Sequence, residues 1–244
     1  MTPELPQPAG AEVSFVVTAL NEEAHVAATV ATIRAAAAGL LKDHEILLVD
    51  DGSTDRTGAV MEGLAAADPR LHVIRNPRNL GLGGAYKRGM AAARKDYVMW
   101  VSGDNAETAE NLRNILRHVG RADIVIPVLV DQRSRPWFRR FTSRLYVRLV
   151  NILFGLRIRY YNGAVVHRRE LIQGVEITTD SFAYQTEALV RLLRAGHSYL
   201  EVPYTSATYS GVFSYAMRPK NVLRVCETLL RLFFWVRLGG GHRP

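Results

Sequence analysis

The chain has 244 residues, of which 48% are apolar and 22% charged, and its formal net charge is +8. This composition is typical of a folded globular protein and excludes wholesale disorder. The single cysteine, Cys226, excludes an intrachain disulfide and a Cys-rich zinc site. The positive charge favours an anionic partner, which could be a nucleic acid, a phosphorylated ligand or an anionic membrane surface.

The alternation of apolar runs with helical patterns in the first 130 residues predicts an α/β fold. Buried strands are expected at residues 13–19, 45–49, 71–75, 97–101 and 124–130. Helices are expected from Asn21 to about Ala38, after the turn at residues 50–55, and at residues 83–93 and 107–117. Strands and helices in this order predict a mostly parallel sheet flanked by helices.

The N-terminal residues and the second half of the chain lack the strand–helix alternation of the first 130 residues. Residues 1–10 contain three prolines and no apolar run, so we expect a flexible tail and no signal peptide. No stretch of about 18 residues is apolar and uncharged, so a membrane-spanning helix is not expected. Residues 11–220 are expected to form one catalytic domain, and residues 221–238 a terminal amphipathic helix.

A basic amphipathic helix is predicted at about residues 136–154. Arg140, Arg144 and Arg148 recur every four residues, and an apolar stripe adjoins them: Phe141, Leu145, Leu149 and Ile152. Such a helix suits the interface of an anionic bilayer, although the same pattern fits a solvated face over a hydrophobic core.

Polar side chains follow three of the predicted strands. They are Asn21 and Glu22, then Asp50 and Asp51, and finally Asp104. In parallel sheets, ligands bind beyond the carboxyl ends of the strands, so we expect these loops to form one site. Each loop taken alone could instead cap a helix, and for Asp104 that helix would be 107–117. Packing around Asp51 and Asp104 is expected to be light, as in most functional loops.

A glycine-rich segment at residues 79–84 (Asn-Leu-Gly-Leu-Gly-Gly) invites a dinucleotide-binding interpretation. Tyr86 stands where that motif needs its last glycine, and the segment does not follow the first strand. A Rossmann oxidoreductase is therefore disfavoured. The small residues are instead expected to allow a close approach to a ligand or to the sheet.

Taken together, these motifs resemble the family 2 glycosyltransferases of GT-A fold. The resemblance rests on residues 18–23 (Thr-Ala-Leu-Asn-Glu-Glu), 48–55 (Leu-Val-Asp-Asp-Gly-Ser-Thr-Asp) and 79–85. It is strongest to dolichol- and polyprenyl-phosphate sugar synthases, through Arg139 to Ser143, Asn162-Gly163, and Phe182 with Glu187. It covers roughly residues 13–237 and implies a Rossmann-like, mostly parallel sheet with C-terminal amphipathic helices.

The resemblance implies a nucleotide-sugar donor and a divalent cation, Mg²⁺ or Mn²⁺. Asp51 would hold the base, and Asp104 with Glu107 would hold the cation against the diphosphate. The implied donor-binding residues are Ala19, Asn21, Glu22, Asp50, Asp51, Gly81, Gly84, Lys87 and Gly103. The sequence departs from the family pattern at Ser102, where the first metal-binding acid is expected, and near Thr208, where an arginine is expected.

The resemblance also implies a lipid-linked acceptor. Its phosphate would be held by Arg133, Arg139 and Ser143, together with Asn162 and Gly163. Glu187 would be the general base if the acceptor were a hydroxyl, whereas a phosphate acceptor needs positioning more than deprotonation. Alternatively, Glu187 pairs with Arg191 on an exposed helix face.

The expected function is an inverting hexosyltransferase that acts on a polyprenyl-phosphate-type acceptor. It would be cytoplasmic and peripherally associated with the inner face of the membrane. Two alternatives stay open: transfer to a lipid or glycan hydroxyl, and a nucleic-acid-binding protein that uses the same arginines. Nucleic acid is not expected as a partner, because acidic residues gather at the predicted cleft.

Overall fold

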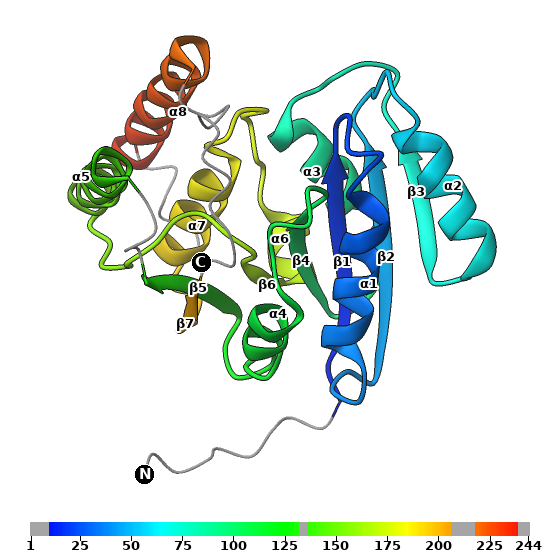
Figure 1. Ribbon diagram of the computed structural model, residues 1–244. Coiled ribbons are helices and arrows are strands. Elements are labelled where there is room, and N and C mark those ends of the chain that lie inside the picture. The colour runs from blue at the N-terminus through cyan, green and yellow to red at the C-terminus, as the bar shows by residue number, and fades with distance from the viewer. Residues whose placement is uncertain (1–9, 132–135, 206–217, 239–244) are drawn as a thin grey trace.

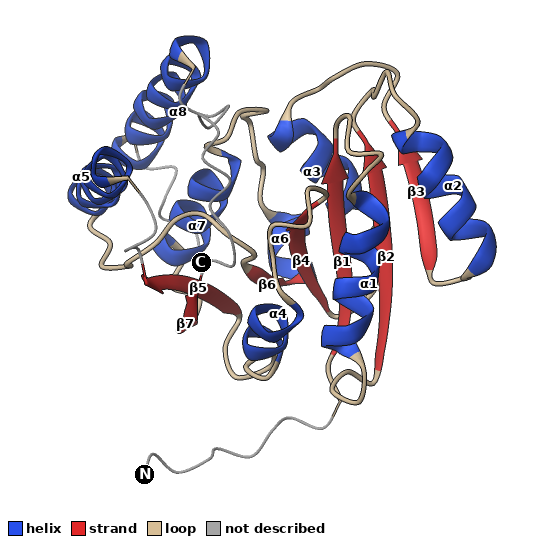
Figure 2. Cartoon of the chain, viewed as in Figure 1, coloured by secondary structure: helices blue, strands red, loops and turns tan. Residues whose placement is uncertain are grey.

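The computed structural model describes residues 10–131, 136–205 and 218–238, and within them the chain forms one seven-stranded sheet (Figures 1 and 2). Its strand order is β3-β2-β1-β4-β6-β5-β7. The strands are β1 (Glu12–Ala19), β2 (Asp43–Asp50), β3 (Leu71–Arg75), β4 (Tyr97–Ser102), β5 (Ile124–Asp131), β6 (Val166–Arg168) and β7 (Tyr199–Thr205). The helices are α1 (Val26–Ala37), α2 (Thr57–Ala67), α3 (Leu82–Ala92), α4 (Ala109–Leu116), α5 (Trp137–Phe154), α6 (Arg169–Gly174), α7 (Tyr184–Arg194) and α8 (Pro219–Arg237).

The predicted mostly parallel sheet is confirmed. Strands β1, β2, β3 and β4 pair in parallel, and so do β5 and β7. The short strand β6 runs antiparallel to both β4 and β5, and together with β7 it was absent from the prediction. In the register, Ala19 pairs with Asp50, and Thr18 pairs with Ser102. The carboxyl ends of β1, β2 and β4 therefore meet at one edge of the sheet.

Both faces of the sheet are covered, which explains the uninterrupted apolar runs of its central strands. One core packs β1, β2 and β4 against α1, α2 and α4, with Ile33, Met61 and Leu112 fully buried. The other core lies between the sheet and α3, α6 and α7. At Gly89 of α3 an added Cβ would clash with the Val16 side chain, so this glycine lets the helix lie close against β1.

The first helix begins later than predicted. Asn21 to Glu23 do not open it; α1 starts at Val26, and the preceding turn is closed by the Glu22 carbonyl, which accepts the N–H groups of His25 and Val26. Asn21 has a positive φ of 58°, which ends any helical run at this point. The polar groups of these residues bond the loop after β2 instead.

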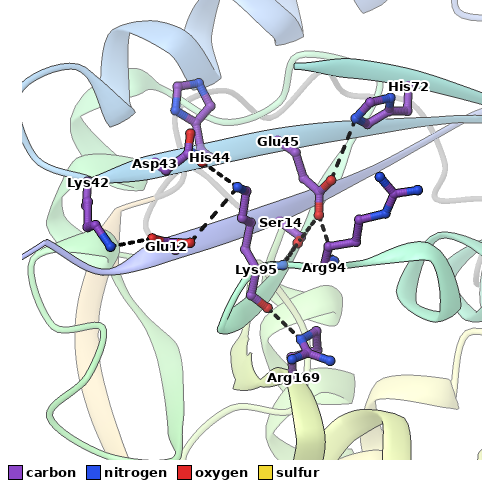
Figure 3. Close-up of polar contacts among 10 residues, drawn as sticks. All are labelled: Glu12, Ser14, Lys42, Asp43, His44, Glu45, His72, Arg94, Lys95 and Arg169. Atoms are coloured by element: carbon purple, nitrogen blue, oxygen red, sulfur yellow. Dashed lines mark hydrogen bonds and ion pairs between the residues drawn. The ribbon is translucent and has the colours of Figure 1, made fainter. Parts of the chain in front are cut away.

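The amino edge of the sheet carries a polar network of its own (Figure 3). Glu45 is 4% exposed and accepts hydrogen bonds from Ser14 Oγ at 2.6 Å and from the Arg94 N–H at 2.7 Å. The Lys95 ammonium bonds the Asp43 carboxylate and thereby lowers the pKa of that carboxyl group. The carboxylates at this edge are occupied in tying strands together, so this edge is structural.

Helices α5 and α8 lie side by side at the end of the sheet that carries β5 and β7 (Figure 1). Their bounds agree with the two predicted amphipathic helices at 136–154 and 221–238. Both expose large apolar side chains, among them Trp137 and Ile152 on α5, and Leu223 and Phe234 on α8. No helix in the described residues is both long enough and apolar enough to cross a membrane.

Candidate functional site

The loops after β1 and β2 are bonded to each other at the carboxyl edge of the sheet. Asn21 Oδ1 accepts the N–H of Thr54 at 2.8 Å, and the Asn21 N–H donates to Ser53 Oγ at 3.0 Å. The Glu22 N–H donates to Thr57 Oγ1 at 2.7 Å. Asp50 Oδ1 accepts the Ser53 N–H at 2.9 Å, which shapes the turn. The structure thus brings the predicted donor residues Ala19, Asn21, Glu22 and Asp50 together.

Asp51 joins a third loop to this edge. Its Oδ1 accepts hydrogen bonds from Asn76 Nδ2 at 2.7 Å and from the Leu80 N–H at 2.9 Å, and its Oδ2 accepts the Gly81 N–H at 3.1 Å. The side chain is buried, with 5% of its residue surface exposed. The expectation of light packing around Asp51 is therefore wrong, because its carboxylate supports the loop that leads into α3. Its assignment to the nucleotide base stays a prediction.

Replacing Asp51 with alanine is expected to lower the free energy of unfolding by about 2–3 kcal/mol, because Asn76 Nδ2 and the Leu80 N–H lose their acceptor, whereas the Gly81 N–H keeps Asn79 Oδ1. Urea denaturation measures this loss. Asp104→Ala is the matched control, since that acid is exposed at the same edge, and its effect should stay within about 0.5 kcal/mol. Equal stabilities of the two variants would contradict the supporting role of Asp51.

The loop after β4 presents Asp104. The Gly103 N–H donates to the Thr18 carbonyl at 3.0 Å, and a Cβ on Gly103 would lie 2.7 Å from that of Ala19, so the loop packs tightly on β1. Asp104 itself is exposed, and its Oδ1 accepts only a local N–H, from Ala106 at 3.1 Å. Helix α4 is capped by Thr108, whose side chain accepts the Asn111 N–H. The alternative role of Asp104 as the cap of this helix is wrong.

The donor set at this edge consists of carboxylate oxygens, which suit a hard cation such as Mg²⁺ or Mn²⁺. Glu107 Oε1 accepts a hydrogen bond from the Tyr204 hydroxyl at 3.3 Å, so this acid is engaged on the side of β7. The part of the chain that the structure describes contains no cluster of three or more His, Cys, Asp or Glu side chains able to hold a metal. The exposed carboxylate of Asp104 fits the binding mode in which one or two carboxylates and a ligand's phosphate groups share the cation.

Gly81, Gly83 and Gly84 lie against another segment of the chain, at residues 178–181. The Gly83 N–H donates to the Asp180 carbonyl at 3.0 Å, and a Cβ on Gly81 or Gly83 would lie 2.8 Å from backbone atoms of this segment. Lys87 Nζ lies 2.7 Å from Asp180 Oδ1. The glycines thus permit a close approach of two backbones, and the predicted donor ligand Lys87 is paired with an acid.

Glu187 anchors the 178–181 segment from α7. Its carboxylate accepts the N–H groups of Thr178 and Thr179, both at 3.1 Å, and the Thr178 hydroxyl at 2.9 Å. Arg191 Nε and Nη2 donate to the same carboxylate at 3.1 and 2.9 Å. The predicted pair with Arg191 is confirmed, but the predicted exposed face is wrong, since Glu187 is 1% exposed.

The sequence analysis missed the contribution of residues 178–181. Thr179 also accepts a hydrogen bond from the Thr228 hydroxyl of α8 at 3.0 Å, so the segment touches α3, α7 and α8. In the sequence this segment is marked only by residue types that commonly cap helices, and it precedes the helix that contains Glu187. Such runs occur before many helices and do not indicate a partner.

The predicted acceptor residues lie on α5 and on the segment that follows it. Arg139 and Ser143 occupy successive turns of α5, and both are half-buried. Asn162 is exposed, and Gly163 has a φ of 107° beside Pro127. Arg133 and the expected arginine position near Thr208 lie outside the described residues.

Comparisons with known proteins agree with this arrangement. The model of the family described as Glycosyl transferase family 2 matches residues 14–184. Polyprenol monophosphomannose synthase of Mycolicibacterium smegmatis is 32% identical over 173 residues, which cover 66% of this chain and 65% of that protein. The undecaprenyl-phosphate 4-deoxy-4-formamido-L-arabinose transferase of an Enterobacter species is 28% identical over 185 residues, which cover 70% of this chain and 56% of that protein. The chain thus spans less than two thirds of these relatives' lengths.

The fold is also found in a solved structure. Glucosyl-3-phosphoglycerate synthase of Mycobacterium tuberculosis, crystallised with Mn²⁺, UDP-glucose and phosphoglyceric acid, superposes with a TM-score of 0.72. The superposition covers 93% of this chain and 81% of that one at 19% identity, so the shared property is the GT-A architecture. From its sheet, the motifs along the carboxyl edge and the family match over residues 14–184, the chain belongs to glycosyl transferase family 2.

Proposed function

We propose that the protein is an inverting glycosyltransferase that moves a hexose from a UDP- or GDP-sugar to a polyprenyl-phosphate-type lipid at the cytosolic face of a membrane. One observation carries the proposal: Asp104 is exposed at the carboxyl edge, where the loops after β1, β2 and β3 are bonded together. The names of two relatives, which carry polyprenol and undecaprenyl phosphate, support the class of acceptor.

In this proposal the loops after β1 and β4 bind the donor. Asn21, Glu22 and Gly103 lie around the nucleotide, and Asp104 faces the diphosphate. A divalent cation held by Asp104 supplies neutralisation of the charge that develops on the leaving nucleoside diphosphate. Mn²⁺ and UDP-glucose in the structurally similar synthase support this assignment.

The acceptor phosphate is already an anion at neutral pH, so the protein's task is to position it. Arg139 and Ser143 hold the phosphate, and one of its oxygens attacks the anomeric carbon from the face opposite the leaving group. The bond from that carbon to the diphosphate oxygen breaks as the new bond forms, which inverts the configuration. No acceptor proton has to be removed.

A transfer screen tests the proposal. The purified protein is incubated with a panel of UDP- and GDP-sugars, with and without polyprenyl phosphate and Mn²⁺. We expect one donor to give a glycosylated lipid phosphate, detected by mass spectrometry, together with release of the nucleoside diphosphate. A product that forms only with hydroxyl acceptors would contradict the assigned acceptor class.

Transfer to a lipid or glycan hydroxyl with Glu187 as general base is the weaker alternative. A base needs a carboxylate oxygen that is available to the acceptor. Both oxygens of Glu187 accept hydrogen bonds from Thr178, Thr179 or Arg191, and the residue is buried. A supporting role for Glu187 therefore agrees better with its surroundings.

A nucleic-acid-binding role would use the same arginines. The arginine stripe of α5 adjoins exposed apolar side chains, and the exposed carboxylate of Asp104 at the carboxyl edge would repel a phosphate backbone unless a cation intervened. Filter binding to tRNA at two salt concentrations separates this class from the proposed one. Tight binding that falls steeply with salt would favour nucleic acid.

The proposed membrane attachment predicts binding to anionic vesicles. Arg140, Arg144 and Arg148 lie beside the exposed apolar stripe of α5, and each arginine near an anionic surface contributes about 1 kcal/mol. In flotation assays the bound fraction should fall as salt rises, because screening shortens the field. Equal flotation on neutral and anionic vesicles would contradict the electrostatic contribution.

A further inference from the structure

A groove of about 470 Å³ lies between α5 and the segment 155–160 that folds back along it. Gly155 ends the helix with a left-handed φ of 66°, which reverses the chain. Helix α5 contributes Ser143, Arg144, Arg148 and Asn151 to the groove, and the returning segment contributes Arg157, Arg159 and Tyr160.

The walls of this groove are fixed by hydrogen bonds. Asn151 Nδ2 donates to the Ile158 carbonyl at 2.9 Å, and Asn151 Oδ1 accepts the Tyr161 hydroxyl at 2.8 Å. Arg159 Nε donates to Glu201 Oε2 of β7 at 2.7 Å. The groove is therefore formed before any ligand arrives, which lowers the entropic cost of binding.

Three of its four arginines carry uncompensated charge. Arg144, Arg148 and Arg157 are exposed, and none of them forms an ion pair with a carboxylate in the described residues. No acidic side chain lines the groove. Guanidinium groups bind phosphate oxygens through paired hydrogen bonds, so three of them around one groove favour a phosphate group as ligand.

The surface next to the groove indicates where that phosphate comes from. Phe141, Leu145, Leu149 and Ile152 form the apolar stripe of α5, and each is between 45% and 73% exposed. Arg144 and Arg148 each follow a residue of this stripe by three positions, which places them along its border. When such a stripe enters the boundary between headgroups and acyl chains, bordering arginines reach the level of the lipid phosphates.

We propose that this groove binds the phosphate of an anionic membrane phospholipid through Arg144, Arg148 and Arg157. The site fixes the orientation of the protein on the bilayer, and it adjoins the proposed acceptor position, because Ser143 also lines the groove. It rests on the membrane attachment that belongs to the proposed function. Tyr160 and Tyr204 pack together between the groove and Glu107, and this layer separates the groove from the proposed cation ligand.

The test uses the whole chain and a monomeric lipid. Calorimetry with dihexanoyl phosphatidic acid, below its micelle concentration, compares the wild type with the groove variant Arg148→Gln/Arg157→Gln. The control variant Arg88→Gln/Arg117→Gln removes the same charge from exposed positions on α3 and at the end of α4. Thermal unfolding checks that all three proteins fold alike.

We expect the groove variant to lose at least about tenfold in affinity for dihexanoyl phosphatidic acid, while the control stays within about twofold. Dihexanoyl phosphatidylcholine should bind none of the three proteins measurably. Equal losses in the two variants would overturn the proposal, because they would indicate a general charge effect. Inorganic phosphate that binds as tightly as the lipid would overturn it in favour of a free phosphate ligand.

A transfer assay in detergent distinguishes this site from the active site. The groove variant should keep the wild-type kcat and the KM for polyprenyl phosphate. A raised acceptor KM with unchanged binding of phosphatidic acid would overturn the proposal and make the groove part of the acceptor site. If no protein transfers sugar from any donor, the proposed function fails, and the calorimetric result still decides the groove.

Discussion

Asp104→Asn is expected to lower the rate of sugar transfer by about 10²–10³-fold, which corresponds to several kcal/mol of lost transition-state stabilisation. Asp104 is the exposed carboxylate that the β4 loop presents at the carboxyl edge of the sheet. Its removal takes away the anchor of the proposed cation where negative charge develops. The substitution keeps the size of the side chain and its contact with the Ala106 N–H.

Binding of Mn²⁺ provides a readout besides turnover. Because the described residues contain no cluster of three potential ligands, we expect Mn²⁺ to bind tightly only when UDP or GDP is present. The loss of the free Mn²⁺ signal in electron paramagnetic resonance measures this binding. Glu110→Gln, on the exposed first turn of α4, is the matched control and should bind as the wild type does.

Two results would contradict this role of Asp104. One is full turnover of the Asp104→Ala variant in the presence of EDTA. The other is equal nucleotide-dependent binding of Mn²⁺ by the wild type and Asp104→Asn. Either result would indicate that cationic side chains, and not a cation held by Asp104, stabilise the leaving nucleoside diphosphate.

Arg139→Ala is expected to lower kcat/KM for a polyprenyl-phosphate acceptor by about 10–100-fold, because it removes a charge-assisted contact of about 1.5–3 kcal/mol. Arg140→Ala is the matched control. It removes the same charge from the next residue, which lies about 100° further around α5. Measurement in detergent separates this effect from attachment to a bilayer.

Glu187→Gln should act differently. The buried carboxylate accepts hydrogen bonds from two backbone N–H groups and from Arg191, so we expect a loss of about 2–4 kcal/mol in the free energy of unfolding. Transfer per folded molecule should stay within about tenfold of the wild type. Urea denaturation and active-site titration with labelled donor measure the two quantities separately.

The pair of variants decides the acceptor class. A general base lost from the reaction costs about 10²–10⁴-fold in rate. If Glu187→Gln loses that much activity at wild-type stability, while Arg139→Ala is nearly normal, the acceptor is a hydroxyl and Glu187 is its base. The expected result is different: Arg139→Ala loses activity, and Glu187→Gln loses stability. That result assigns Glu187 to the support of residues 178–181.

The sequence alone determined the central sheet. The apolar runs that became β1, β2 and β4 are buried on both faces, and a run of this kind has few alternatives to a parallel strand covered by helices. Because parallel strands end at the same edge of the sheet, the sequence also predicted that Asn21, Asp50 and Asp104 lie at one edge. The amphipathic patterns of α5 and α8 were equally readable, because a helical period is a local property.

The contacts between distant segments show which polar side chains support neighbouring loops, and these contacts arise in the folded chain alone. From the sequence, Glu187 is a candidate general base and Asp51 a candidate ligand of the nucleotide base. In the structure their carboxylates support the segments 178–181 and 76–81. Lys87 donates to the Ile177 carbonyl, 90 positions further along the chain. Such contacts depend on how distant segments pack, and no local period or motif encodes them. The groove beside α5 has the same origin, since Arg157 joins Arg144 and Arg148 only after the chain reverses at Gly155.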